Sequence, residues 1–228
     1  MYAFCVSERL TMSTDALPHG PRQQTVPLPN GDMTLWIPMG TDALLDALAD
    51  APPDPDDKMP YWADLWPASI AMAKEIERGG IAVAGREVLE IGSGLGLVSL
   101  AAARAGANAC ATDWDEDALR YVHASAQANS LVVKTARLDW RSPPIESPAE
   151  IVIAADVLYE ERNVGDVARA LPKLLKDDGE AWIADPGRVH LPAFIRAVSD
   201  FEVAYVQRIE HTSAKTAVGI HLIRLRRK

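Results

Sequence analysis

The chain has 228 residues and a formal net charge of −9, from 23 basic and 32 acidic side chains. This length suits one α/β domain with an N-terminal extension, and the acidic balance argues against a nucleic-acid partner, which needs a broad basic surface. No run approaches the ~18 apolar residues of a membrane span, so we expect no membrane partner.

Composition divides the chain into three parts. Residues 1–30 are rich in proline and predict a flexible leader, and residues 31–59 form an N-terminal segment that ends in a linker of proline and aspartate. Residues 60–228 then form the main domain. The first ten residues lack the basic head of a signal peptide, and Cys5 and Cys110 are the only cysteines. We therefore expect a cytoplasmic protein without a disulfide.

The most informative segment is Val88–Gly96, in which an apolar strand carrying Glu90 runs into three glycines at alternate positions. Glycines are needed where the chain turns sharply from strand to helix and where a ligand lies against bare backbone. A dinucleotide fingerprint would place its third glycine at position 97, which is leucine here, so the spacing argues against NAD. The loop instead resembles motif I of class I S-adenosylmethionine (AdoMet) methyltransferases. That resemblance implies cofactor contacts from Gly92, Ser93, Gly94 and Gly96, and from Glu90 to the amino group of AdoMet.

The following strand also ends on an acid. A helix of small residues over 97–106 leads to a buried strand over 109–113, which places Asp113 about 20 residues after Gly92. A carboxylate at this spacing accepts hydrogen bonds from ribose hydroxyls, which NAD and AdoMet both carry. The alternative is that Asp113 only caps the next helix.

Strands and helices alternate through the rest of the chain. We expect a helix over 115–129, an extended segment near 132–138, a strand over 151–155, a helix over 162–176, a strand over 180–184, a short helix over 192–198 and a terminal hairpin over 201–208 and 217–225. This order predicts an α/β fold with a mostly parallel sheet and helices on both faces. Five strands end on an acid at the edge where such sheets bind ligands: Glu90, Asp113, Asp139, Asp156 and Asp185.

Four motifs occur in an order that resembles the seven-strand protein-lysine methyltransferases, which include enzymes that methylate chaperones and the electron-transfer-flavoprotein β subunit. They are Pro60–Ser69, the glycine loop, Leu138–Trp140 and Ala155–Tyr159. The resemblance covers roughly residues 60–225. It implies a Rossmann-like class I methyltransferase fold with seven strands, in which the last strand lies antiparallel beside the fifth. Asp185–Arg188 is similar to the corresponding loop of the flavoprotein-subunit branch.

The resemblance also implies roles for single residues. Asp156 and Tyr159 match the substrate motif D-x-x-Y and are the expected catalytic residues. The expected cofactor contacts, besides the glycine loop and Glu90, are Trp66, Asp113, Trp114, Asp139, Trp140 and Ala155. The cofactor is then AdoMet, its product is S-adenosylhomocysteine (SAH), and the partner is a protein that presents a lysine.

The chemistry of methyl transfer constrains the role of Asp156. The acceptor amine must be neutral, and a nearby carboxylate favours the ammonium form, whereas a sulfonium charge and an apolar site oppose it. We therefore expect Asp156 to orient the amine rather than act as a strong base, with Tyr159 bounding the amine pocket. Two alternatives stay open: a small-molecule N-methyltransferase, and a non-catalytic AdoMet-binding module. The five histidines show no metal-binding spacing, so no metal is expected.

Overall fold

The structure is a computed structural model that describes residues 17–38, 44–46, 59–143, 148–212 and 217–228. Its main body is one seven-stranded sheet with the strand order β5-β4-β3-β6-β7-β9-β8. The strands are β3 (Glu87–Ile91), β4 (Asn108–Asp113), β5 (Lys134–Arg137), β6 (Ala149–Ala155), β7 (Leu175–Asp185), β8 (Phe201–Thr212) and β9 (Ala217–Arg227). β3 to β7 are parallel, and β9 is antiparallel to both β7 and β8. The expected fold class and the antiparallel insertion beside the fifth strand are confirmed.

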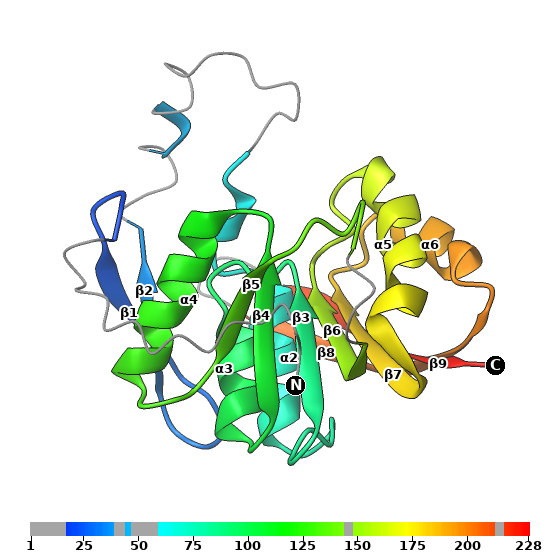
Figure 1. Ribbon diagram of the computed structural model, residues 1–228, viewed down its shortest axis with the longest axis horizontal. Coiled ribbons are helices and arrows are strands. Elements are labelled where there is room, and N and C mark those ends of the chain that lie inside the picture. The colour runs from blue at the N-terminus through cyan, green and yellow to red at the C-terminus, as the bar shows by residue number, and fades with distance from the viewer. Residues whose placement is uncertain (1–16, 39–43, 47–58, 144–147, 213–216) are drawn as a thin grey trace.

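Helices cover both faces of this sheet (Figure 1). Helices α2 (Pro67–Glu77), α3 (Leu97–Arg104) and α4 (Glu116–Ala128) pack on one face, and α5 (Glu161–Leu174) and α6 (Leu191–Ala197) pack on the other. Alternate residues of β3 serve the two faces, because Val88 packs with α2 and Leu89 packs with α5. Within the described ranges, every helix is too short or too polar to cross a membrane.

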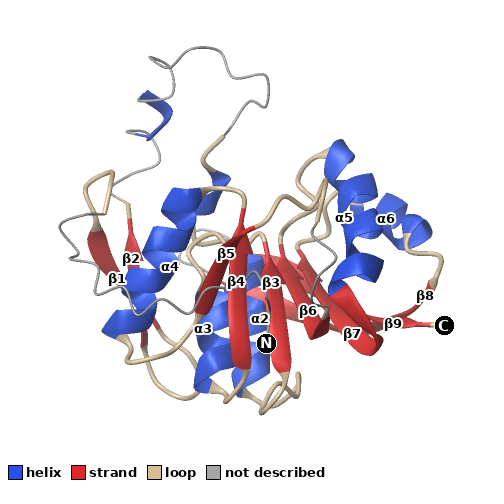
Figure 2. Ribbon diagram, viewed as in Figure 1, coloured by secondary structure: helices blue, strands red, loops and turns tan. Residues whose placement is uncertain are grey.

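A separate hairpin lies against α4, at the left of Figure 2. It pairs β1 (Arg22–Val26) with β2 (Met33–Ile37). Strand β2 is hydrogen-bonded to the C-terminal end of α4, since Trp36 N donates to Ser125 Oγ at 2.9 Å and Thr34 N donates at 3.0 Å to Oδ1 of Asn129, the residue that follows the helix. The structure thus places a strand in the segment that the sequence assigns to a leader, and the expected division at residue 30 runs through this hairpin.

The later elements follow the predicted order, with one shift at the end of α5. The sequence extends that helix to Lys176, but the helix ends at Leu174 and β7 begins at Leu175. Leu175 pairs with Ala149 of β6 and is buried, so strand pairing and burial override the local helical pattern.

The cysteines differ from expectation. Cys110 is fully buried in β4 and is disulfide-bonded, while Cys5 lies outside the described residues. The prediction that the chain has no disulfide is wrong. Neither cysteine lies in a paired motif, so the sequence carried no signal for this bond.

Candidate functional site

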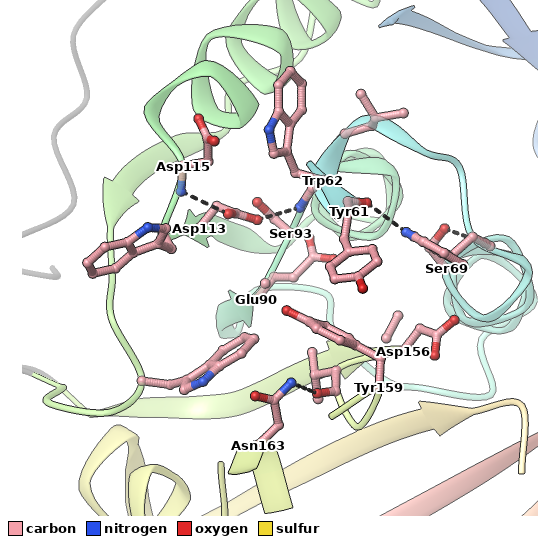
Figure 3. Close-up of a pocket in the computed structure, with 18 of the residues that line it drawn as sticks. Tyr61, Trp62, Ser69, Glu90, Ser93, Asp113, Asp115, Asp156, Tyr159 and Asn163 are labelled. Atoms are coloured by element: carbon pink, nitrogen blue, oxygen red, sulfur yellow. Dashed lines mark hydrogen bonds between the residues drawn. The ribbon is translucent and has the colours of Figure 1, made fainter. Parts of the chain in front are cut away.

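A pocket opens at the carboxyl ends of β3, β4 and β6 (Figure 3). Asp113 and Asp115 lie toward one end of it, and Asp156 and Tyr159 lie toward the other. Each of the site residues predicted from the sequence lines this pocket: Trp66, Glu90, Gly92, Ser93, Gly94, Gly96, Asp113, Trp114, Asp139, Trp140, Ala155, Asp156 and Tyr159. The structure therefore brings them together, and their individual roles stay predictions.

The three glycines of the loop all have left-handed backbone angles, with φ of 63° at Gly92, 50° at Gly94 and 76° at Gly96. A Cβ atom at Gly92 would lie 2.9 Å from the Trp140 ring, and one at Gly94 would lie 3.1 Å from a backbone oxygen of Trp62. The protein's own packing thus requires these glycines, in addition to any ligand. The sequence predicted the need for glycine from the sharp turn and from the ligand, and contacts with Trp140 and Trp62 add a third reason.

The hydroxyl group of Ser93, in the glycine loop, is an unsatisfied hydrogen-bonding group. Its Oγ is buried and has no hydrogen-bond partner among the described residues. A buried hydroxyl without a partner costs free energy, and a polar ligand seated in the pocket would remove that cost. This orphaned group fits a loop that binds a polar ligand.

Glu90 is 1% exposed and lies on β3 facing α3. Its Oε2 accepts hydrogen bonds from the backbone N and the Oγ of Ser99 in the first turn of α3. Burial raises the pKa of Glu90 to about 8, although the hydrogen bonds from Ser99 act in the opposite direction. Glu90 therefore ties strand to helix and still lines the pocket.

Asp113 holds the glycine loop in place. One carboxylate oxygen accepts from Gly94 N at 2.8 Å and the other accepts from Asp115 N at 3.0 Å. Burial raises the pKa of Asp113 to about 6 against the effect of these two hydrogen bonds. A carboxylate has about four acceptor positions, so the predicted contact with a ribose hydroxyl is compatible with this arrangement.

Beyond Asp113, the rim of the pocket carries an aromatic and basic cluster. The guanidinium groups of Arg137 and Arg141 lie 4.7 and 4.8 Å from the centre of the Trp114 ring. Arg141 also donates to Asp139, with Nε 2.9 Å from Oδ1. Burial alone would raise the pKa of Asp139, but the hydrogen bonds and charge of Arg141 outweigh it and the pKa lies below its usual range.

At the opposite end, Asp156 follows β6 in an unusual backbone conformation. Its φ is 61°, its backbone N donates to Ala184 O at 2.8 Å, and its side chain is 3% exposed. A left-handed aspartate costs on the order of 1 kcal/mol, and such residues concentrate at functional sites. Oδ1 of Asp156 accepts a hydrogen bond from Nε of Arg188 and forms an ion pair with it.

Three aromatic rings stand near Asp156. The rings of Tyr61 and Tyr159 are 4.8 Å apart, and those of Tyr61 and Trp66 are 6.4 Å apart. Trp66 donates from Nε1 to Tyr61 O at 2.8 Å, and Arg188 lies 5.8 Å from the centre of its ring. Burial raises the pKa of Tyr159 to about 12, so its hydroxyl stays protonated. These contacts place Trp66 with the residues around Asp156.

Asp185 is the exception among the five acids at the strand ends. It does not line the pocket, and its Oδ1 accepts from the backbone N atoms of Gly187 and Arg188, each at 2.7 Å. Its role is to shape the turn that follows β7. Asp185 ends β7 at the carboxyl edge of the sheet, as the sequence predicts, but its carboxylate is bonded to the following turn and does not line the pocket.

Sequence reasoning assigned no role to Tyr61, Trp62 or Arg188. Tyr61 and Trp62 line the pocket, and Arg188 contacts Asp156. All three belong to motifs that the sequence analysis singled out, so the signal was present. The motifs could not show that Tyr61 contacts Tyr159 or that Arg188 contacts Asp156, because these partners lie about 30 to 100 positions apart in the sequence.

The chain is similar to a known family, to curated relatives and to solved structures. The family described as lysine methyltransferase matches residues 61–201. Zebrafish (Danio rerio) protein N-lysine methyltransferase METTL21A is 29% identical over 124 residues, which are 51% of this chain and 56% of that protein. The zebrafish electron transfer flavoprotein beta subunit lysine methyltransferase is 29% identical over 138 residues, which are 60% of this chain and 52% of that protein. The chain thus matches little more than half the length of these curated relatives.

A solved structure agrees on the fold. The T. thermophilus 16S rRNA N2 G1207 methyltransferase RsmC, in complex with AdoMet and guanosine, superposes with a TM-score of 0.58 at 16% identity, over 93% of this chain and 52% of that chain. At this identity the likeness concerns the fold alone.

Proposed function

Because this chain belongs to the lysine methyltransferase family, we propose that it transfers the methyl group of AdoMet to the side-chain amine of a lysine in a partner protein. One observation carries the proposal. A single pocket joins the glycine loop, with the orphaned Ser93 hydroxyl, to a carboxylate and two tyrosine rings at its other end. A cofactor and an acceptor can therefore meet inside it.

The proposal assigns the cofactor to the end around the glycine loop. Gly92, Ser93 and Gly94 would hold AdoMet along the loop, Glu90 would face its amino group and Asp113 its ribose. Trp114, Asp139, Trp140 and Ala155 complete this end of the pocket. When bound, AdoMet supplies a methyl group on a sulfonium centre, and the same residues would release SAH afterwards.

The acceptor end positions the amine. Asp156 would accept a hydrogen bond from the lysine nitrogen, and the faces of Tyr61 and Tyr159 would border its methylene chain. The nitrogen–carbon bond forms as the sulfur–carbon bond breaks, the electron pair stays on sulfur, and the amine proton leaves to solvent. Positioning supplies most of the acceleration in such an in-line displacement.

The proposal places the enzyme in the cytoplasm, as the sequence analysis expected. The small number of cysteines is not evidence for this location, because Cys110 is disulfide-bonded.

Labelling with tritiated AdoMet tests the proposal. The purified protein is added to a lysate of its source organism from which the gene has been deleted, and labelled proteins are separated from labelled small molecules. We expect a discrete protein band whose label is recovered as methyl-lysine. Label confined to small metabolites would favour the small-molecule N-methyltransferase, and AdoMet binding without any transfer would favour the non-catalytic module. Calorimetry provides a control, because NAD should not bind where AdoMet and SAH do.

A further inference from the structure

At the acceptor end of the pocket, Arg188 donates a hydrogen bond to one carboxylate oxygen of Asp156. The Asp156 side chain is 3% exposed and that of Arg188 is 28% exposed, so their ion pair is largely shielded from water. Arg188 does not line the pocket itself, whereas Asp156 does. The guanidinium therefore approaches the carboxylate from outside the space that an acceptor would fill.

The turn after β7 fixes Arg188 in this place. The buried carboxylate of Asp185 accepts from the backbone N atoms of Gly187 and Arg188, and Gly187 has a left-handed φ of 82°. On its other side, the guanidinium of Arg188 lies 5.8 Å from the centre of the Trp66 ring. The hydrogen bond to Asp156 raises the pKa of Arg188, so the group stays charged at every working pH.

A carboxylate next to an acceptor lysine creates a chemical problem. The free amine of lysine has a pKa of about 10.4, and a neighbouring negative charge stabilises its ammonium form further. An ammonium nitrogen has no lone pair and cannot attack the methyl group. An unpaired Asp156 would bind the lysine well and hold it in the unreactive form.

We propose, on the basis of the proposed function, that Arg188 is a positioning residue that cancels the charge of Asp156, so that this carboxylate orients the acceptor amine without trapping it as an ammonium ion. The pair presents a hydrogen-bond acceptor with little net charge. The ring of Tyr159 adds an uncharged face, because burial raises the pKa of its hydroxyl to about 12. The charged and titratable groups that line the pocket or contact this pair are Tyr61, Asp64, Glu90, Asp113, Asp115, Asp139, Arg141, Asp156, Tyr159, Glu160, Arg162, Asp166, Asp185 and Arg188.

The test compares variants of Arg188 in the tritiated-AdoMet assay between pH 7 and pH 9.5. We expect Arg188→Met and Arg188→Gln to be about tenfold slower than the wild type at pH 7, which is the effect of raising the pKa of the acceptor amine by one unit. The deficit should shrink toward pH 9.5, where solvent removes the proton. Arg188→Lys keeps the charge and should restore most of the rate.

Three controls separate charge from folding. Arg226→Met removes a comparable ion pair, with Glu180 at 3.0 Å on neighbouring strands outside the pocket, and should leave the pH profile unchanged. AdoMet affinity, measured by calorimetry, should be unaffected by Arg188→Met. In an Asp156→Asn background, Arg188→Met should cause little further loss, because the charge that it compensates is absent.

A rate deficit of Arg188→Met and Arg188→Gln that is equal at every pH would overturn the role of Arg188, as would full activity of both variants at pH 7. These outcomes leave the proposed function standing. If the wild-type protein labels no protein at all, the proposed lysine transfer itself fails.

Discussion

Two carboxylates at the glycine-loop end of the pocket, Glu90 and Asp113, accept hydrogen bonds from backbone N atoms, whereas Asp156 at the other end is held by the side chain of an arginine. Asp113 binds Gly94 N and Asp115 N, and Glu90 binds Ser99 N. By contrast, Asp156 is held by the side chain of Arg188, and Tyr61 packs on the ring of Tyr159. The first arrangement makes the cofactor loop part of the fold. The second leaves the acceptor site free to change with little effect on the sheet.

The largest expected effect concerns Asp156. Because its carboxylate is held by a side chain and not by the backbone of the sheet, replacing it should greatly reduce methyl transfer without unfolding the protein. Asparagine tolerates the left-handed φ of 61° and still accepts a hydrogen bond from Arg188, but it carries no charge. We expect Asp156→Asn to lower the transfer rate roughly 10²-fold, the range for a lost positioning or acid–base group, with AdoMet affinity nearly unchanged.

Scintillation counting and calorimetry on the same preparation check this prediction. Asp177→Asn is the matched control, since Asp177 also pairs with an arginine but lies outside the pocket. An Asp156→Asn protein with full transfer activity would remove Asp156 from the mechanism.

The next effect is at the cofactor end, where binding and fold should fail together. Gly94→Val places a branched side chain at a left-handed φ, 3.1 Å from the Trp62 backbone oxygen. We expect AdoMet affinity to fall tenfold or more, about 1.4 kcal/mol, and thermal stability to fall as well. Because an added Cβ at Gly94 meets the backbone of Trp62, the substitution disturbs the protein's own packing as well as the surface of the pocket.

Gly85→Val separates backbone strain from contact in the Gly94 experiment. Gly85 has a similar left-handed φ of 73° but no atom within 4 Å of an added Cβ, and it does not line the pocket. The Gly85→Val protein should be less stable than the wild type but bind AdoMet with the same affinity. Unchanged affinity in Gly94→Val, with a native circular dichroism spectrum, would show that the loop is not the binding site.

The same comparison explains what the sequence predicted. The glycine loop and Asp113 form a local pattern of strand, turn and helix, so their spacing was enough to predict that they lie together in one pocket. The alternation of elements similarly predicted the order of strands. Both signals depend on neighbours close in sequence.

The acceptor end required contacts that no local pattern contains. Arg188 reaches Asp156 only because β6 and β7 are adjacent and parallel, and Tyr61 reaches Tyr159 only because the segment before α2 folds over the sheet edge. Asp185 fitted the pattern of strand-end acids, yet its carboxylate turned to the backbone of its own loop. Local spacing identifies candidate residues, and tertiary packing decides which of them face the ligand.

The smallest expected effect concerns Glu90, the one buried acid at the cofactor end whose pKa is raised to about 8. Its ordinary value is 4.5, so the folded protein keeps this proton at pH values where the unfolded chain has released it. Each increase in pH between those values therefore favours the unfolded chain, and the stability of the cofactor-free protein should fall over that window. Asp113 contributes in the same direction only up to about pH 6. Burial also lowers the pKa of His211 and raises that of Asp185, so the contribution of Glu90 between pH 6 and pH 8 is obtained as the difference between the wild type and Glu90→Gln. Glu90→Gln cannot ionise, so its melting temperature should be flatter in this interval by a few degrees, since about 2–4 °C corresponds to 1 kcal/mol in a chain of this size. If the melting temperatures of the two proteins change in parallel with pH, the raised pKa of Glu90 is contradicted.

Adding AdoMet should reduce the pH dependence of the melting temperature in the wild type alone, because a cationic amino group beside Glu90 stabilises the ionised carboxylate. An unchanged pH dependence would place that amino group elsewhere in the pocket.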